Sequence, residues 1–271
     1  MELQSFLPAF EAAGVSVYVV FPEPLEQLAS FAADYAITLP LLADPDSEVI
    51  REVGILNTTL TEDDAPFYGI PFPGSYVLGE DGRVVAKFFE QNSLVRAHPD
   101  LLLQAATGKE IEPVASAPVS PPEHVELEVA LNAEELPAFL LRDLVVTLRV
   151  PAGQHLYGLP VSEGLVATSV DIDESKYLGM QPAVLPPTHP MVLMGTGETL
   201  HVYEGDVTIR IPVLYNAYRI KPDESGATNI ELTGTVRWQS CDDHTCHIPR
   251  TETFSIAVPV RGPNVPVAAS G

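Results

Sequence analysis

The sequence predicts two domains of different fold class, an α/β domain followed by an all-β sandwich. Three observations lead to this prediction. Residues 1–111 alternate between helical and strand periodicity, residues 112–123 are rich in proline, and from residue 124 onward apolar and polar residues alternate with a period of two. At 271 residues the chain is long for a single compact unit, which agrees with two domains.

The α/β prediction for the first half rests on helices and strands that follow one another along the chain. Apolar residues at spacings of three and four indicate amphipathic helices, and a β-branched apolar run indicates a buried strand. In chain order the predicted elements are a helix across 3–10, a buried strand at 15–21, a helix across 28–35, a short helix at 47–53 with Asp46 as its N-cap, strands at 75–78 and 84–89 joined by a turn, and a helix at 99–108.

The second half loses the helical period. Half-buried strands separated by turn residues are predicted at 125–131, 144–150, 207–213, 230–238 and 254–260. Five such strands with no helix between them favour an antiparallel sandwich. The segment 112–123 (EPVASAPVSPPE) contains four prolines and reads as a semi-rigid linker. The expected boundaries are therefore a domain at 1–111, a linker at 112–123, a sandwich at 124–263 and a tail at 264–271.

Composition excludes several classes of partner. The net charge is −23 and the pI is near 4.4, so the surface repels nucleic acid and anionic lipid. No run approaches the roughly 18 apolar residues of a membrane span, so none is expected. The first fourteen residues lack the basic start and unbroken apolar centre of a signal peptide. They resemble a helix already in progress, and we expect this chain to be a trimmed part of a longer product.

Cys241 and Cys246 are the two cysteines of the chain, and alternating strands precede and follow them. They should therefore flank a four-residue connection at the end of a hairpin. Opposed residues in an antiparallel pair have Cα atoms about 4.5–5.5 Å apart, and a disulfide tolerates about 4.4–6.8 Å. A bond between these two sulfurs can form without moving the strands.

Three uses of this pair remain open on the residues alone. A purely structural disulfide would close a ring of about six residues, worth only about 2 kcal/mol. A metal site could use Cys241, His244, Cys246 and His247, although four ligands so close in sequence would struggle to make a tetrahedron. A redox pair agrees with the exposed loop and the close spacing. Asp242 and Asp243 should raise the pKa of a neighbouring thiol, whereas the two histidines and Arg250 could lower it, and the net sign stays undecided.

The cysteine segment 238–249 (WQSCDDHTCHIP) resembles the signature of the amino-terminal, immunoglobulin-like domain of the bacterial thiol:disulfide interchange protein DsbD and its relatives. Both show an aromatic residue, Gln, a small residue and Cys, then an acidic stretch, a second Cys and Pro. Residues 151–157 (PAGQHLY) resemble the Gly-x-His-x-Tyr strand of that family, and the likeness covers about 124–262. It implies a dithiol that exchanges electrons with other thiol proteins through transient mixed disulfides.

The same resemblance implies roles and a compartment. Cys241 and Cys246 would be the catalytic pair, and Asp242, Asp243, His244 and His247 the supporting residues. In this family a loop caps the cysteines, for which 177–190 is the candidate. The compartment would be the periplasm or cell envelope, with the cytoplasm as the alternative. No cofactor and no metal are expected.

The first half is similar to the peroxiredoxin-like redoxins (the AhpC/TSA group) of the thioredoxin fold. The matching pieces are 10–15 (FEAAGV), 35–44 (YAITLPLLAD), 68–77 (YGIPFPGSYV) and 81–82 (DG). By this match Pro73 occupies the position of the cis-proline that faces the active site, so the resemblance allows a cis bond there. The reactive cysteine of that family would precede residue 2, and no cysteine occurs before Cys241. The resemblance therefore implies a thioredoxin-like domain that is incomplete at its N-terminus.

These observations predict a thiol–disulfide redox protein that relays electrons through Cys241 and Cys246, an oxidoreductase of the antioxidant redoxin type. Two alternatives stay open. One is a peroxidase whose reactive cysteine lies upstream, with Cys241 or Cys246 resolving the sulfenic acid. The other is a non-catalytic interaction module in which the disulfide is structural.

Overall fold

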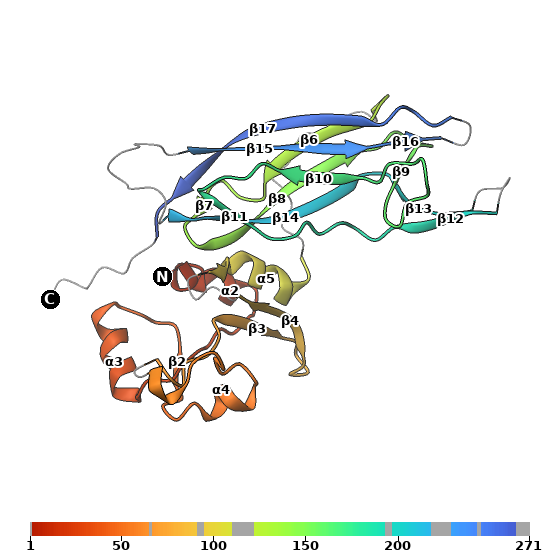
Figure 1. Ribbon diagram of the computed structural model, residues 1–271. Coiled ribbons are helices and arrows are strands. Elements are labelled where there is room, and N and C mark those ends of the chain that lie inside the picture. The colour runs from red at the N-terminus through yellow and green to blue at the C-terminus, as the bar shows by residue number, and fades with distance from the viewer. Residues whose placement is uncertain are drawn as a thin grey trace. The chain divides into compact units, whose positions relative to one another are not determined.

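The computed structural model describes residues 2–64, 67–90, 95–109, 122–192, 197–217, 229–242 and 245–263. They form two compact units, one within Met1–Ile111 and one within Glu112–Gly262. Figure 1 shows that helices belong to the first unit and that long strands make up the second.

The first unit combines short helices with two separate strand pairs. β1 (Val19–Phe21) and β2 (Leu41–Ala43) run parallel, and β3 (Gly74–Leu78) and β4 (Val84–Phe89) form an antiparallel hairpin. The remaining elements are α1 (Glu2–Ser5), α2 (Leu7–Ala12), α3 (Leu25–Asp34), α4 (Glu48–Glu52), η1 (Glu62–Asp64), β5 (Arg96–Ala97) and α5 (Pro99–Thr107). Its buried apolar residues are Phe10, Leu28, Leu39, Ile50, Val77 and Val95.

Two details of the first unit differ from the prediction. The strand expected at 15–21 covers only Val19–Phe21, because only these three residues pair with β2. It was expected to be buried and is half-buried. The predicted N-cap Asp46 is wrong. Asp44, at the end of β2, places its carboxylate over the start of α4, where it accepts the N–H groups of three successive residues at 2.9–3.2 Å. This carboxylate satisfies donors that a helix N-terminus leaves unpaired.

Pro73 directly precedes β3, and the peptide bond before it is trans, since the cis peptide bond among the described residues is Leu159–Pro160. The cis bond that the redoxin resemblance allowed at Pro73 is therefore not formed. The trans isomer of an X–Pro bond is lower in free energy by about 0.5–1 kcal/mol.

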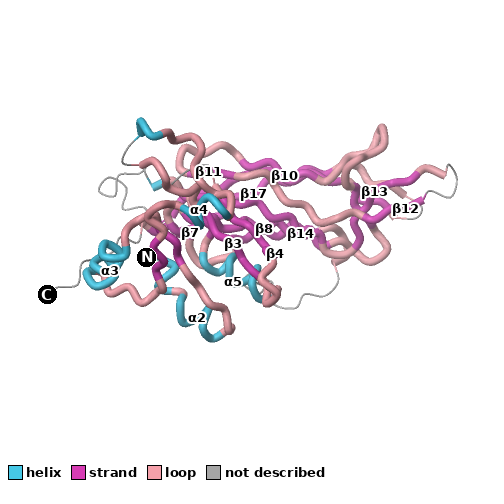
Figure 2. Tube along the Cα trace, turned by 90° about the horizontal axis from the view of Figure 1, so that it is seen from below, coloured by secondary structure: helices cyan, strands magenta, loops and turns pink. Residues whose placement is uncertain are grey.

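The second unit is built from three sheets, seen from below in Figure 2. Its strands are β6 (Glu126–Leu131), β7 (Leu136–Pro137), β8 (Leu140–Arg149), β9 (His155–Tyr157), β10 (Ser169–Ile172), β11 (Leu178–Met180), β12 (His189–Val192), β13 (Thr199–Glu204), β14 (Val207–Tyr215), β15 (Asn229–Trp238), β16 (Ser240–Cys241) and β17 (Arg250–Arg261). One sheet has the order β10-β15-β17-β7, and another has β11-β14-β8 with β6 also paired to β8. The pairing is antiparallel except between β17 and β7, which run parallel.

The main core of the second unit lies between these two sheets. Burial alternates along β14 residue by residue, as expected for a strand with one face in a core. Leu144 and Ile209 come from one sheet and Leu232 and Val258 from the other, and all four are at most 1% exposed. The five strands predicted from alternation are therefore present as β6, β8, β14, β15 and β17.

Gly234 makes a testable contribution to this packing. A Cβ atom at this position in β15 would lie 2.6 Å from the carbonyl oxygen of Asp171 and 2.7 Å from the ring of Phe254. We expect Gly234→Ala to destabilise the sandwich by about 1–3 kcal/mol through overpacking. Urea unfolding followed by the fluorescence of Trp238, the single tryptophan, measures this.

The matched control is Gly262→Ala, where a Cβ would meet nothing within 4 Å. If Gly234→Ala leaves the unfolding midpoint unchanged, β10 and β17 can move away from the added methyl group without a loss of stability.

The third sheet, β12-β13-β9-β16, carries the cysteine segment. Leu156 and Tyr203 are register partners and belong to the main core. Tyr157, Val202 and Cys241 belong instead to a separate small cluster. Because successive side chains of a strand point to opposite faces, this sheet packs on the core with one face and presents the cysteine with the other.

Candidate functional site

Cys241 and Cys246 form a disulfide whose Cα atoms are 4.1 Å apart. They are directly opposite each other in an antiparallel bridge. The N–H of Asp242 donates to the carbonyl oxygen of Thr245 at 2.9 Å, and the N–H of His247 donates to that of Ser240 at 2.9 Å. The disulfide therefore links the non-hydrogen-bonded pair between two hydrogen-bonded pairs, where side chains are closest. The predicted position at a hairpin end is correct.

The residues just before Cys241 anchor this hairpin to the sandwich. Trp238 ends β15 opposite Arg250 and is only 1% exposed, within the main core. The Gln239 side chain accepts the N–H of Val166 at 2.9 Å and donates to the carbonyl oxygen of His247 at 3.1 Å. Ser240 then pairs with Leu156, so the chain changes from one sheet to another within two residues. The Trp-Gln-Ser sequence thus fixes where the two cysteines lie.

The two sulfurs have different surroundings. Cys241 is 1% exposed, whereas Cys246 is an exposed residue. The cover over Cys241 is apolar and comes from the buried Tyr157, Leu200 and Val202, with the partly buried Val161, Leu165 and Met191 packed against them. Cys246 is therefore the more exposed residue of the pair.

The expected cap at 177–190 is wrong for most of its length. β11 (Leu178–Met180) pairs with β14, and Val184 forms a bridge with Arg210 of the same strand. This segment therefore extends the main sandwich. The apolar cover over Cys241 comes instead from β9 and β13, through Tyr157, Leu200 and Val202, and Val161 and Leu165 of the connection after β9 pack against it.

Tyr157 and His155 are functional candidates that were not among the predicted site residues. The Tyr157 hydroxyl lies 3.5 Å from Cys246 Sγ, and His155 Nε2 lies 3.3 Å from that hydroxyl. His155 pairs with Cys241 in the register of β9 and β16 and is 5% exposed. The His-x-Tyr pattern at 155–157 was the sequence signal for them.

The predicted supporting residues have different places. The Asp242 carboxylate accepts the N–H of Thr245 at 2.7 Å, so it stabilises the turn. Asp243 and His244 lie outside the described residues. His247 lines a small pocket of about 120 Å³ whose lining contains no cysteine. Pro73 belongs to the first unit.

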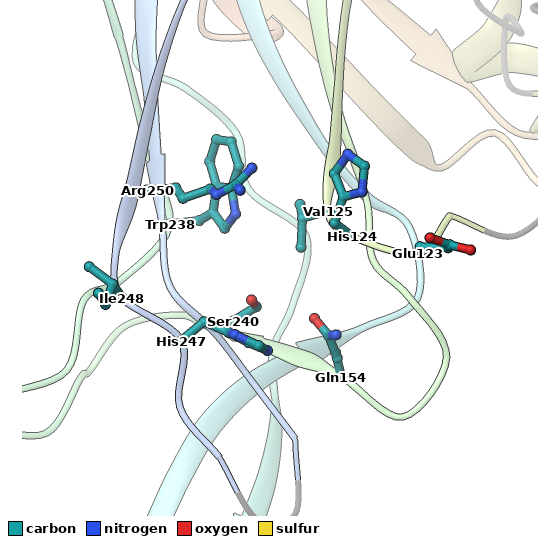
Figure 3. Close-up of a pocket in the computed structure, with 9 residues that line it drawn as sticks. All are labelled: Glu123, His124, Val125, Gln154, Trp238, Ser240, His247, Ile248 and Arg250. Carbon is teal, nitrogen blue, oxygen red and sulfur yellow. The ribbon is translucent and has the colours of Figure 1, made fainter.

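Figure 3 shows this pocket, with Trp238, Ser240, His247 and Arg250 on one side and Gln154 and the segment 123–125 on the other. The His247 side chain therefore lies beside this hollow, and its backbone N–H bonds to Ser240 next to the disulfide. Among the described residues, no group of three or more His, Cys, Asp or Glu is placed to hold a metal ion. The metal alternative also loses its two sulfur ligands, because they are bonded to each other.

Comparison with known families gives two matches on separate parts of the chain. Residues 1–87 match the AhpC/TSA family, and residues 141–258 match the family described as thiol:disulfide interchange protein DsbD, N-terminal. Together with the α/β and all-β units, these matches confirm the predicted fold class: a thioredoxin-like AhpC/TSA region followed by an immunoglobulin-like domain of the DsbD N-terminal type.

Two individual relatives also have sequence similarity to part of this chain. The peroxiredoxin-type proteins MT2597 and Rv2521, from two strains of Mycobacterium tuberculosis, are each 34% identical over 80 residues, which is 28% of this chain. The chain spans about half the length of these curated relatives, at 47%.

Solved structures with similarity include the reduced DsbD N-terminal domain of Neisseria meningitidis, at 15% identity and a TM-score of 0.33, covering 52% of this chain and 90% of that one. The N-terminal periplasmic domain of ScsB from Proteus mirabilis has 13% identity and a TM-score of 0.34, covering 53% of this chain and 49% of that one. No helix in the described part of the chain is long and apolar enough to cross a membrane.

Proposed function

We propose that this chain, an AhpC/TSA-like region joined to a DsbD N-terminal-like domain, is a thiol–disulfide carrier that works through Cys241 and Cys246. The observation that carries the proposal is the asymmetry of the pair: an exposed Cys246 is bonded to a Cys241 that is 1% exposed. A disulfide that exchanges with proteins needs one sulfur that a partner's thiolate can reach. Thiol–disulfide redox chemistry fits both family matches.

The exchange follows from this asymmetry. A partner thiolate attacks Cys246 Sγ, the Cys241–Cys246 bond breaks, and Cys241 leaves as a thiolate that takes up a proton. The partner is then held to Cys246 by a mixed disulfide. The partner's second thiolate attacks its own bonded sulfur and releases Cys246 as a thiolate, so two electrons have passed to this chain and the partner carries the disulfide. Run in reverse, the same steps reduce a substrate disulfide.

The partners in this proposal are dithiol or disulfide proteins. The name of the matched family, thiol:disulfide interchange protein, supports this class of partner. The direction of electron flow depends on whether the partner's reduction potential is above or below that of the Cys241–Cys246 pair. We also propose the periplasm or cell envelope as its compartment, where disulfides form and persist, and the likeness to the DsbD N-terminal family supports this. Within this chain the sandwich pair is the one thiol centre, because the sequence has two cysteines in total.

The structural-staple alternative is separated from the carrier by the reduction potential. We expect the pair to equilibrate with glutathione buffers at a potential nearer −200 mV than −300 mV (both approximate). Thiol trapping with a mass-tagged alkylating reagent, at a series of glutathione ratios, measures the reduced fraction. A disulfide that stays intact in reduced glutathione, with a potential below about −300 mV, would contradict the carrier and support a structural bond.

A further inference from the structure

Two polar side chains lie in line with the sulfur of Cys246 and lead into the third sheet. Tyr157 Oη lies 3.5 Å from Cys246 Sγ, and His155 Nε2 lies 3.3 Å from Tyr157 Oη. The two rings pack edge to face, with centroids 5.3 Å apart. Tyr157 is 3% exposed and His155 is 5% exposed, so neighbouring side chains hold both rings in place.

The protonation of His155 decides the direction of both contacts. The sulfur of a disulfide carries no proton, so in a hydrogen bond with Cys246 the Tyr157 hydroxyl is the donor. The phenol has a single O–H, which can donate either to Cys246 Sγ or to an unprotonated Nε2 of His155. When His155 carries a proton on Nε2, the phenol oxygen accepts from it and the O–H is left for sulfur. Both the neutral Nε2–H tautomer and the imidazolium meet this requirement.

We propose that His155 is a positioning residue for thiol exchange: by donating from Nε2 to Tyr157 Oη, it directs the Tyr157 O–H at Cys246 Sγ and so stabilises the thiolate that forms there. This inference rests on the proposed carrier function and deepens it, because it names the groups that tune the reactive sulfur. Hydrogen bonds to an ionised acceptor are stronger than those to a neutral one. The contact with Cys246 should therefore strengthen when the disulfide is reduced.

The stabilised thiolate occurs in a defined step. When the partner's second thiolate attacks the mixed disulfide, the bond from the partner to Cys246 breaks and its electron pair goes to Cys246 Sγ. In the reverse direction the same thiolate attacks a substrate disulfide. A lower pKa of the Cys246 thiol makes it a better leaving group in the first case and more ionised in the second.

The surroundings keep the proton on Tyr157. Burial raises the pKa of the Tyr157 phenol, so it stays a donor through the physiological range. On β13, the strand beside β9, the titratable groups are His201, Tyr203 and Glu204, of which Glu204 is the register partner of His155. On the other side, Asp242 follows Cys241. Glu204 also contacts His189 at 3.3 Å.

Tyr157→Phe tests the donor. In the reduced protein, the rate of iodoacetamide labelling of Cys246 is measured against pH by peptide mass spectrometry. We expect the midpoint to rise by about one pH unit, which is about a tenfold smaller thiolate fraction. The thiolate of higher pKa is also about threefold more nucleophilic, at a Brønsted coefficient of about 0.4–0.5. The two effects together should lower the labelling rate at neutral pH about three- to fourfold. Tyr203→Phe is the matched control, because Tyr203 is equally buried but faces the main core.

His155 is tested by two variants that differ in their ability to donate. His155→Leu should shift the labelling midpoint in the same direction as Tyr157→Phe, and His155→Gln, whose amide N–H can donate, should restore part of the difference. Nitrogen NMR of the oxidised wild type should report a proton on Nε2 of His155. A neutral ring protonated on Nδ1 alone, or a midpoint that neither Tyr157→Phe nor His155→Leu moves, would overturn the proposal.

Failure of this inference can be told apart from failure of the carrier function. If the wild-type pair equilibrates with glutathione but the Cys246 midpoint ignores both variants, only the role of His155 and Tyr157 is wrong. If the wild-type disulfide resists glutathione, the carrier function is wrong, whatever the variants do to the labelling of the chemically reduced protein.

Discussion

Cys246→Ser is expected to slow adduct formation with glutathione disulfide at least about tenfold relative to Cys241→Ser. The thiol left in Cys246→Ser is Cys241, which is 1% exposed beneath an apolar cover. It can react only when the hairpin opens, and an opening that costs about 1.4 kcal/mol already lowers the rate about tenfold. Intact-mass spectrometry of the reduced variants, sampled over time with glutathione disulfide, measures both rates.

The matched variant Cys241→Ser should accumulate a stable adduct on Cys246. Its exposed thiolate can attack the reagent, and no second thiol is present in the chain to release the product. Equal rates for the two variants would show that burial of Cys241 does not protect it. Faster labelling of Cys246→Ser would reverse the order of attack.

Trp238→Ala is expected to lower the free energy of unfolding of the sandwich by about 3–5 kcal/mol, the usual cost of truncating a large buried aromatic residue. Trp238 is among the largest side chains in the main core and is 1% exposed. It also joins β15 to the cysteine hairpin. Denaturant unfolding followed by circular dichroism measures the loss, since the variant has no tryptophan fluorescence.

Ile248→Ala is the control for this prediction. Ile248 lies on the same hairpin but is 87% exposed, so its truncation should change stability by no more than about 0.5 kcal/mol. Similar losses for the two variants would mean that the hairpin, and not the core position of Trp238, determines the stability measured.

The long strands of the second unit could be predicted because their alternation records one buried face. β14 and β15 each keep this pattern along nearly their whole length. Alternation could not predict the short strands β9, β12, β13 and β16, because they are too short to carry a clear period of two. β9 and β13 also contribute residues to both apolar clusters, so apolar residues lie on both of their faces. In the first unit, the apolar run at 15–21 overstated the strand, since only three of its residues find a partner in β2.

The position of the cysteines was predictable and their asymmetry was not. The alternating strands around Cys241 and Cys246 predicted a hairpin end where the two sulfurs can bond, and the disulfide is found there. Which sulfur is exposed depends on Leu200 and Val202, strand residues that no local pattern connects to the cysteines. Tyr157 lies 89 residues before Cys246 in the sequence, and only the pairing of β9 with β16 brings it to the disulfide.

The most direct test of this account is competitive alkylation of the reduced wild-type chain. A brief pulse of iodoacetamide, quenched and followed by isotope-coded alkylation in denaturant, reports the relative reactivity of the two thiols in one sample. We expect label from the pulse at Cys246, with Cys241 at least about tenfold lower. Equal labelling, or preferential labelling of Cys241, would contradict a carrier whose exchange begins at the exposed sulfur.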